Sequence, residues 1–144
     1  MQAITDNFFV TGQIHAEHFA LAKEQGITLI INNRPDGEEN GILSVSDAQN
    51  LATEQGITYL HLPMANGQPL PEDLIPNMQA ALQAQTENNG KTLAHCRSGT
   101  RSSFLWAAVQ IIEGQASAQE TIQMAAKAGI NLTSFMPFLQ HLEQ

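Results

Sequence analysis

The sequence predicts an α/β fold in which a small central parallel sheet is flanked by helices. Short apolar runs alternate with helical patterns along the 144 residues, as is typical of sheets built from βα units. The run 27–32 (Ile-Thr-Leu-Ile-Ile-Asn) is short and β-branched, which indicates a strand buried on both faces. The sequence Leu-Ala-Lys-Glu-Gln-Gly-Ile-Thr at 21–28 recurs with one substitution at 51–58. Reuse of one helix-to-strand junction indicates two neighbouring βα units.

Glycines and capping patterns set the expected boundaries of the elements. Gly26 and Gly56 each follow a helical pattern and precede an apolar run, as expected of residues that end a helix. Ser46 and Ser117 each begin a capping-box pattern. The predicted strands cover 8–14, 27–32, 57–62 and 91–95, and the predicted helices cover 15–25, 46–55, 72–86, 104–112, 117–129 and 131–142.

Length and composition indicate one globular domain over residues 1–144, with 42% apolar residues. The net charge of −8 disfavours nucleic acid and anionic membranes as partners. We expect no signal peptide, and no apolar run in the sequence approaches the length of a membrane span. The single cysteine rules out an internal disulfide and fits a reducing compartment, so the expected location is the cytoplasm.

That cysteine, Cys96, lies between the predicted strand 91–95 and the buried helical run that follows. A strand, a tight loop and a helix N-terminus direct successive backbone N–H groups at one point and so bind anions. These surroundings lower the pKa of a thiol, so we expect a nucleophilic thiolate at Cys96. The planar guanidinium of Arg101 is expected to hold substrate oxygens as the second catalytic group. The predicted anion-binding loop consists of Arg97, Ser98, Gly99, Thr100, Arg101 and Ser102.

Several nearby side chains are candidates for supporting roles. His95 alternates away from the cysteine along its strand, so we interpret it as a buried orienting residue rather than a base. Arg97 is expected to point outward. Asn33 and Arg34 follow the strand 27–32 and should line the pocket, because ligands bind beyond the carboxyl ends of parallel strands; a turn-forming role for Asn33 is the alternative. The other histidines show no ligand spacing with Cys96, so no metal and no cofactor is expected.

The loop is short. Four residues separate Cys96 from Arg101, one fewer than in tyrosine and dual-specificity phosphatases. The length is similar to the active loop of single-domain rhodaneses, which are sulfurtransferases. A tighter ring of N–H groups suits a terminal sulfur on Cys96 better than a phosphoryl group.

Three segments carry a family resemblance: Ile-Asn-Asn-Arg-Pro-Asp-Gly-Glu at 31–38, Tyr-Leu-His-Leu-Pro at 59–63 and Ala-His-Cys-Arg-Ser-Gly-Thr-Arg-Ser at 94–102. Through these motifs the whole chain resembles the bacterial beta-lactamase-hydrolase-like family of phosphatase-like domains. It implies a small tyrosine-phosphatase-like fold. It also implies that Ser102 corresponds to the hydroxyl that eases thiolate departure in phosphatases, although a helix N-cap is an equal alternative. Relatives are fused to persulfide dioxygenase domains, which implies such a partner.

The sequence departs from the phosphatase pattern at the general acid as well as in loop length. No carboxylate follows the strand 57–62 before Glu72 and Asp73; Asp36 or Glu38 is the candidate substitute. A sulfurtransferase needs no such acid. The leading prediction is therefore a sulfurtransferase that takes sulfur from thiosulfate or a persulfide through a Cys96 persulfide. The alternatives are a phosphatase acting on phosphate esters through a phosphocysteine, and a non-catalytic domain that senses anions.

Overall fold

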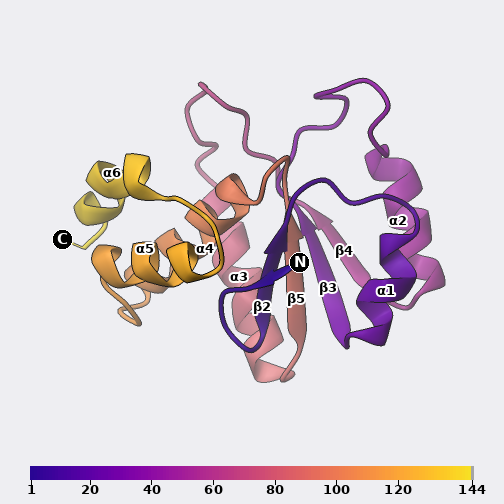
Figure 1. Ribbon diagram of the computed structural model, residues 1–144, viewed down its shortest axis with the longest axis horizontal. Coiled ribbons are helices and arrows are strands. Elements are labelled where there is room, and N and C mark those ends of the chain that lie inside the picture. The colour runs from indigo at the N-terminus through magenta and orange to yellow at the C-terminus, as the bar shows by residue number, and fades with distance from the viewer. Residues whose placement is uncertain (144) are drawn as a thin grey trace.

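A five-stranded sheet lies between two groups of helices in the computed structural model, which describes residues 1–143 (Figure 1). The strand order is β1-β2-β5-β3-β4, and every neighbouring pair is parallel except β1 and β2. The expected parallel sheet is thus confirmed for four strands, with a short antiparallel strand added at one edge. The strands are β1 (Gln2–Ala3), β2 (Phe8–Thr11), β3 (Ile27–Asn32), β4 (Thr58–His61) and β5 (Lys91–His95).

Helices cover both faces of the sheet (Figure 1). One face is covered by α1 and α2, and the other by α3 and α4. The C-terminal helices pack on the far side of α4 and form a third layer. The helices are α1 (His18–Glu24), α2 (Val45–Glu54), α3 (Leu74–Glu87), α4 (Thr100–Ile112), α5 (Ala118–Lys127), the 3-10 helix η1 (Thr133–Phe135) and α6 (Met136–His141).

The apolar side chains form two cores, one on each face of the sheet. The smaller core joins α1 and α2 to the sheet through residues such as Phe19 and Ile30. The larger core is centred on α4, where Trp106 and its neighbours are buried on nearly all sides. Phe138 is 41% exposed, unlike the buried Phe8, Phe19, Phe104 and Trp106. None of the helices in residues 1–143 is long and apolar enough to cross a membrane.

The strands that the sequence located best are the two most buried, β3 and β5, whose ends match the prediction. The predicted capping box at Ser46 is wrong. The extended residue Ser44 caps α2 instead, because its side chain accepts a hydrogen bond from the Asp47 N–H at 3.1 Å. The capping box at Ser117 is confirmed. The helix predicted over 131–142 is divided into η1 and α6.

The register of the sheet brings four chain segments to one edge. Thr11 at the end of β2 pairs with His95 at the end of β5, and Asn32 at the end of β3 pairs with both His95 and His61. The loops that follow β3 and β4 rise beyond this edge, beside the segment that joins β5 to α4 (Figure 1). The loops that follow β3 and β4 therefore lie at the same edge of the sheet as Cys96, which directly follows β5.

Candidate active site

Cys96 lies directly after β5 and is only 1% exposed. The Gly99 N–H donates a hydrogen bond to its Sγ at 3.1 Å. Burial raises the pKa of the thiol, but hydrogen bonds from the backbone N–H groups of Ser102, Ser98, Gly99 and Arg101 outweigh burial and bring the pKa below its usual value. The structure therefore has the ring of N–H groups that the sequence predicts, closed around sulfur.

Two glycines allow the loop to curve so tightly. Gly99 is the N-cap of α4 and has φ +91°, a left-handed conformation that favours glycine. Gly12, after β2, lies against the loop from outside: a Cβ on it would be 2.7 Å from the Arg97 carbonyl oxygen. The N-cap role considered for Ser102 is wrong, because Gly99 occupies that position and Ser102 lies within the first turn of the helix.

Arg101 is buried in the first turn of α4, with its guanidinium beside the loop. Its Nη1 and Nη2 donate to the two carboxylate oxygens of Glu38, both at 2.9 Å, and Nη1 also donates to the Met64 carbonyl at 2.7 Å. A guanidinium has five N–H donors. Within residues 1–143, the two donors that neither Glu38 nor Met64 engages are the Nε–H and one Nη2–H, which form the side-on edge that can bind two oxygens of an anion.

Glu38 is held by two arginines. Besides Arg101, Arg34 donates from Nε to a Glu38 oxygen at 2.6 Å. The hydrogen bond from Arg101 is the largest influence on this carboxyl, and together with Arg34 it outweighs partial burial and lowers the pKa of Glu38 to about 2. Glu38 is therefore ionised at neutral pH. It orients the arginine and has no proton to donate as a general acid.

Asn33 and Arg34 lie beneath the site instead of lining an open pocket. Asn33 is fully buried, and its side-chain oxygen accepts a hydrogen bond from the Ser102 hydroxyl at 2.8 Å. Arg34 is 2% exposed, and its Nη1 donates to the side-chain oxygen of Gln13 at 3.1 Å. Asn33 thus contacts the first turn of α4 directly through Ser102, whereas Arg34 acts through Glu38, which holds Arg101. Neither of the roles predicted for Asn33, pocket lining or turn formation, describes these contacts.

His95 is buried as expected, at 1% exposed. Neither ring nitrogen has a hydrogen-bond partner within residues 1–143. Burial lowers the pKa of His95 to about 4, so the imidazole is neutral at neutral pH. The structure confirms that His95 is buried, but within residues 1–143 the ring makes no hydrogen bond through which it would orient another group.

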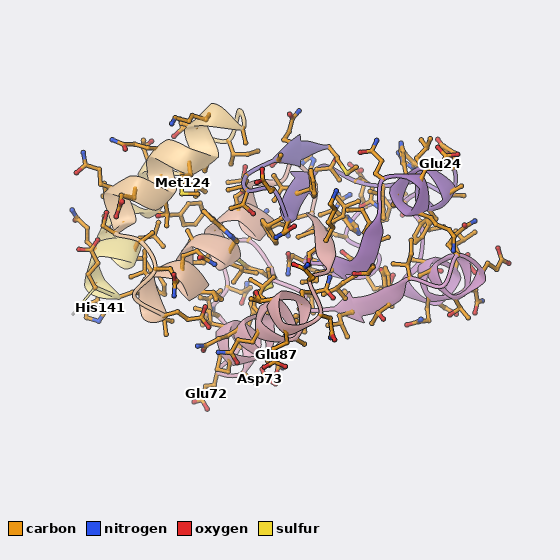
Figure 2. All side chains as sticks on the ribbon, turned by 90° about the horizontal axis from the view of Figure 1, so that it is seen from below. Glu24, Glu72, Asp73, Glu87, Met124 and His141 are labelled. Carbon is orange, nitrogen blue, oxygen red and sulfur yellow. The ribbon has the colours of Figure 1, made fainter. Side chains whose placement is uncertain are left out.

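The remaining predicted residues lie around the rim. Arg97 and Ser98 are exposed, and the Ser98 and Thr100 hydroxyls lie 3.1 Å apart. Asp36 accepts a hydrogen bond from the Val45 N–H at 3.2 Å. Figure 2 shows Glu72 and Asp73, the first carboxylates after β4, at the edge of the molecule, and both are exposed. Among residues 1–143, no group of three or more His, Cys, Asp or Glu is placed to hold a metal ion.

The sequence did not predict the two acceptors that hold the Arg101 guanidinium, which are the Glu38 carboxylate and the Met64 carbonyl. For Glu38 it suggested only the role of a general acid. The Met64 contact uses a backbone carbonyl, which no side-chain pattern reveals. The only indication for Glu38 was the position of a carboxylate four residues after Arg34, a spacing common among surface residues.

Comparison with known proteins places the fold in a class. A protein of Neisseria meningitidis, provisionally described as a phosphatase, has a structure that matches with a TM-score of 0.82 at 27% identity, covering 98% of this chain and 96% of that one. Tk-PTP in its active form matches with a TM-score of 0.79 at 15% identity, covering 99% and 95% of the two chains. The fold, with Cys96 and Arg101 on a loop after the central strand, is therefore that of a tyrosine-phosphatase-like domain.

The family follows from the sequence itself. Residues 1–118 match the model of the beta-lactamase hydrolase-like protein, phosphatase-like domain, and the chain belongs to that family. The beta-lactamase hydrolase-like protein of Xylella fastidiosa (strain 9a5c) is 31% identical over 137 residues, which is 95% of this chain. The chain spans about a third of that relative's length, 31%. The resemblance seen in the sequence is thus confirmed, as is the tyrosine-phosphatase-like fold.

Proposed function

We propose that this domain is a cysteine-dependent phosphatase that acts on small anionic phosphate esters through a phosphocysteine. The observation that carries this proposal is the arrangement around Arg101. Glu38 and the Met64 carbonyl take three of its five N–H donors, and the free side-on edge can bind two oxygens of a phosphoryl group. The phosphatase-like family and the Neisseria relative support this function over the sulfurtransferase that the loop length favours.

The reaction would proceed in two steps. In the first, the Cys96 thiolate attacks phosphorus, the Sγ–P bond forms, and the bond to the leaving oxygen breaks with its electron pair on that oxygen. The loop N–H groups and Arg101 hold the three remaining oxygens as negative charge moves among them. In the second step, water attacks phosphorus, the Sγ–P bond breaks, and inorganic phosphate and the thiolate are released.

Protonation of the leaving oxygen determines which esters react well. Glu38 is held as a carboxylate by Arg101 and Arg34, so it does not supply this proton. Asp36 is the other predicted candidate, and its carboxylate accepts a hydrogen bond from the Val45 N–H at the start of α2. An aryl phosphate, whose leaving group is stable as an anion, is therefore the best first substrate. A general acid contributes about 10²–10⁴-fold toward poorer leaving groups.

The sulfurtransferase remains the second candidate because of one observation: only four residues separate Cys96 from Arg101. A terminal sulfur transferred from thiosulfate would sit on Cys96 within the same ring of N–H groups. The sulfite that leaves is a stable anion and needs no proton. A persulfide dioxygenase partner, implied by the family resemblance, belongs with this second function.

The deciding experiment compares the wild type with Cys96→Ser on two substrates. We expect phosphate release from 4-nitrophenyl phosphate by the wild type only. Thiocyanate formation from thiosulfate and cyanide, again by the wild type only, would instead establish the sulfurtransferase. If neither reaction depends on Cys96 while phosphate or sulfate binding protects the thiol from alkylation, the domain is an anion-binding module.

A further inference from the structure

Asn33 ties together three of the segments that build the site. The residue is fully buried at the end of β3. Its backbone N–H donates to the His95 carbonyl at 2.8 Å, and its backbone carbonyl accepts from the Met64 N–H at 3.0 Å. Its side-chain Nδ2 donates to the Leu62 carbonyl at 2.8 Å, and its Oδ1 accepts from the Ser102 Oγ at 2.8 Å.

These partners fix the direction of the bond to Ser102. The Leu62 carbonyl can only accept, so the side-chain NH₂ of Asn33 must face it and the Oδ1 must face Ser102. An amide oxygen can only accept, so Ser102 is the donor. A hydroxyl has one hydrogen, and that hydrogen is directed at Asn33. Ser102 therefore offers the Cys96 sulfur its backbone N–H and not its hydroxyl.

We propose that Asn33 is a positioning residue that holds the Ser102 hydroxyl away from the Cys96 thiolate in the resting site. A thiolate that accepts one more strong hydrogen bond is more stable and less nucleophilic, so holding the hydroxyl elsewhere keeps the sulfur reactive. The same hydroxyl, released by rotation about the Ser102 Cα–Cβ bond, can donate to the sulfur when it leaves phosphorus in the second step. The role of the hydroxyl in the second step rests on the proposed function. The hydrogen bond from Ser102 to Asn33 in the resting site does not depend on it.

The prediction concerns thiol reactivity and can be tested without a substrate. In Asn33→Ala the Ser102 hydroxyl loses its acceptor and can turn to the sulfur. The pH midpoint of Cys96 alkylation by iodoacetamide should then fall by roughly 0.5–1 pH unit. The rate at the high-pH plateau should fall about two-fold, since nucleophilicity decreases with thiol pKa. The other charged or titratable groups near the thiol are Arg101 of α4, Glu38 and Arg34 after β3, and His95 of β5, and they are the same in every variant.

The control is the double variant Asn33→Ala/Ser102→Ala, in which no hydroxyl remains to turn. We expect its midpoint to equal that of Ser102→Ala and to lie close to that of the wild type. An unchanged or higher midpoint in Asn33→Ala, or a fall that persists in the double variant, would overturn the proposal. All variants are first checked for cooperative urea unfolding, because loss of the bond to Leu62 also weakens the fold.

Ser102→Ala provides a second test if Asn33→Ala does not fold, because it keeps the bond from Asn33 to the Leu62 carbonyl. Its alkylation midpoint should lie close to that of the wild type, since the Ser102 hydroxyl donates to Asn33 and not to the sulfur in the resting site. A clearly higher midpoint in Ser102→Ala would mean that the hydroxyl already stabilises the resting thiolate, and it would overturn the proposal. Hydrolysis of 4-nitrophenyl phosphate by the wild type tests the phosphatase separately. The expected alkylation pattern without hydrolysis would sustain the role of Asn33 and reject the phosphatase.

Discussion

At the scale of single residues, the reactivity of Cys96 depends on backbone dipoles more than on side-chain charge. Four N–H groups lower the pKa of the thiol against the opposing effect of burial. Arg101 is available for substrate oxygens because Glu38 holds its other edge. Two tasks follow from the proposed function: the loop backbone contributes most to the low pKa of the Cys96 thiol, with a further attraction from Arg101, and the edge of Arg101 that Glu38 does not hold would bind the anion.

Arg101→Lys tests the second of these tasks. A lysine keeps the charge but loses the planar pair of donors, so kcat/KM for an aryl phosphate should fall by roughly 10²–10³-fold. The rate of Cys96 alkylation at pH 7 should change much less, because the N–H ring is retained. An equal loss in both measurements would show that the lysine has disrupted the loop rather than the anion contact.

Glu38→Gln makes a prediction about stability and pH. The folded protein lowers the pKa of Glu38 from 4.5 to about 2, so the carboxylate contributes stability in full above about pH 4.5, and that contribution is lost as the pH falls toward 2. The variant should therefore be less stable than the wild type at pH 7, and the difference should shrink as the pH is lowered. Urea unfolding between pH 7 and pH 3 measures this, and a constant difference would contradict the ion-pair explanation.

The sequence placed Cys96 and Arg101 on one tight loop, as the structure shows, because both lie in one short segment; their catalytic roles stay a prediction. It could not predict the contacts of Glu38 and Asn33. These residues lie 63 and 69 positions before their partners in α4, and only the order of the strands brings them together. Polar residues after a strand are equally compatible with a solvated turn, which is one of the alternatives the sequence left open for Asn33.

At the scale of elements, the curvature of the active loop depends on the strand beside it. Gly12 follows β2 and lies against the Arg97 peptide, leaving no room for a side chain. The ends of β2, β3 and β5 thus act as a rigid frame for the loop. The buried strands β3 and β5 were predicted to the residue because continuous apolar runs define them. Helix starts were predicted less well, since Ser44 and Ser46 are both plausible caps and only the backbone conformation distinguishes them.

Gly12→Ala tests this frame. A Cβ at 2.7 Å from the Arg97 carbonyl oxygen must push the loop aside, because the atom it meets is backbone. We expect a loss of about 1–3 kcal/mol in the free energy of unfolding, together with a higher pH midpoint for Cys96 alkylation as the N–H ring is distorted. Gly37→Ala is the control for an added methyl group in open space, because a Cβ there meets no atom within 4 Å; its φ of +70°, unlike that of Gly12, lies in the left-handed region. It should cost some stability without moving the midpoint.

At the scale of the whole molecule, the C-terminal helices belong to the same core as the helix that carries the site. Leu132 and Leu139 are fully buried in the larger core with α4. A Cβ added to Gly99 would lie 3.2 Å from Cδ1 of Ile130, so the Ile130 side chain lies close to the active loop. The third layer therefore supports the active loop from behind, although the family model matches only residues 1–118.

Leu132→Ala should accordingly lower the free energy of unfolding by about 2–5 kcal/mol, the usual cost of a cavity in a packed core. Because α5 and α6 share one core with α4, chemical unfolding should remain a single transition when followed by the only tryptophan, Trp106, and by helical circular dichroism. Two separate unfolding transitions, with the one reported by Trp106 unaffected by Leu132→Ala, would show that the C-terminal helices fold independently of the site.

The most direct test of the proposed chemistry is the mass of the protein captured during turnover. Wild type mixed with 4-nitrophenyl phosphate and quenched in acid within milliseconds should carry a phosphoryl adduct of about 80 Da on the peptide that contains Cys96, absent from Cys96→Ser. Hydrolysis that depends on Cys96 but shows no such adduct would contradict a phosphocysteine. An adduct of about 32 Da formed only from thiosulfate and removed by cyanide, with no phosphate release, would identify the domain as a sulfurtransferase.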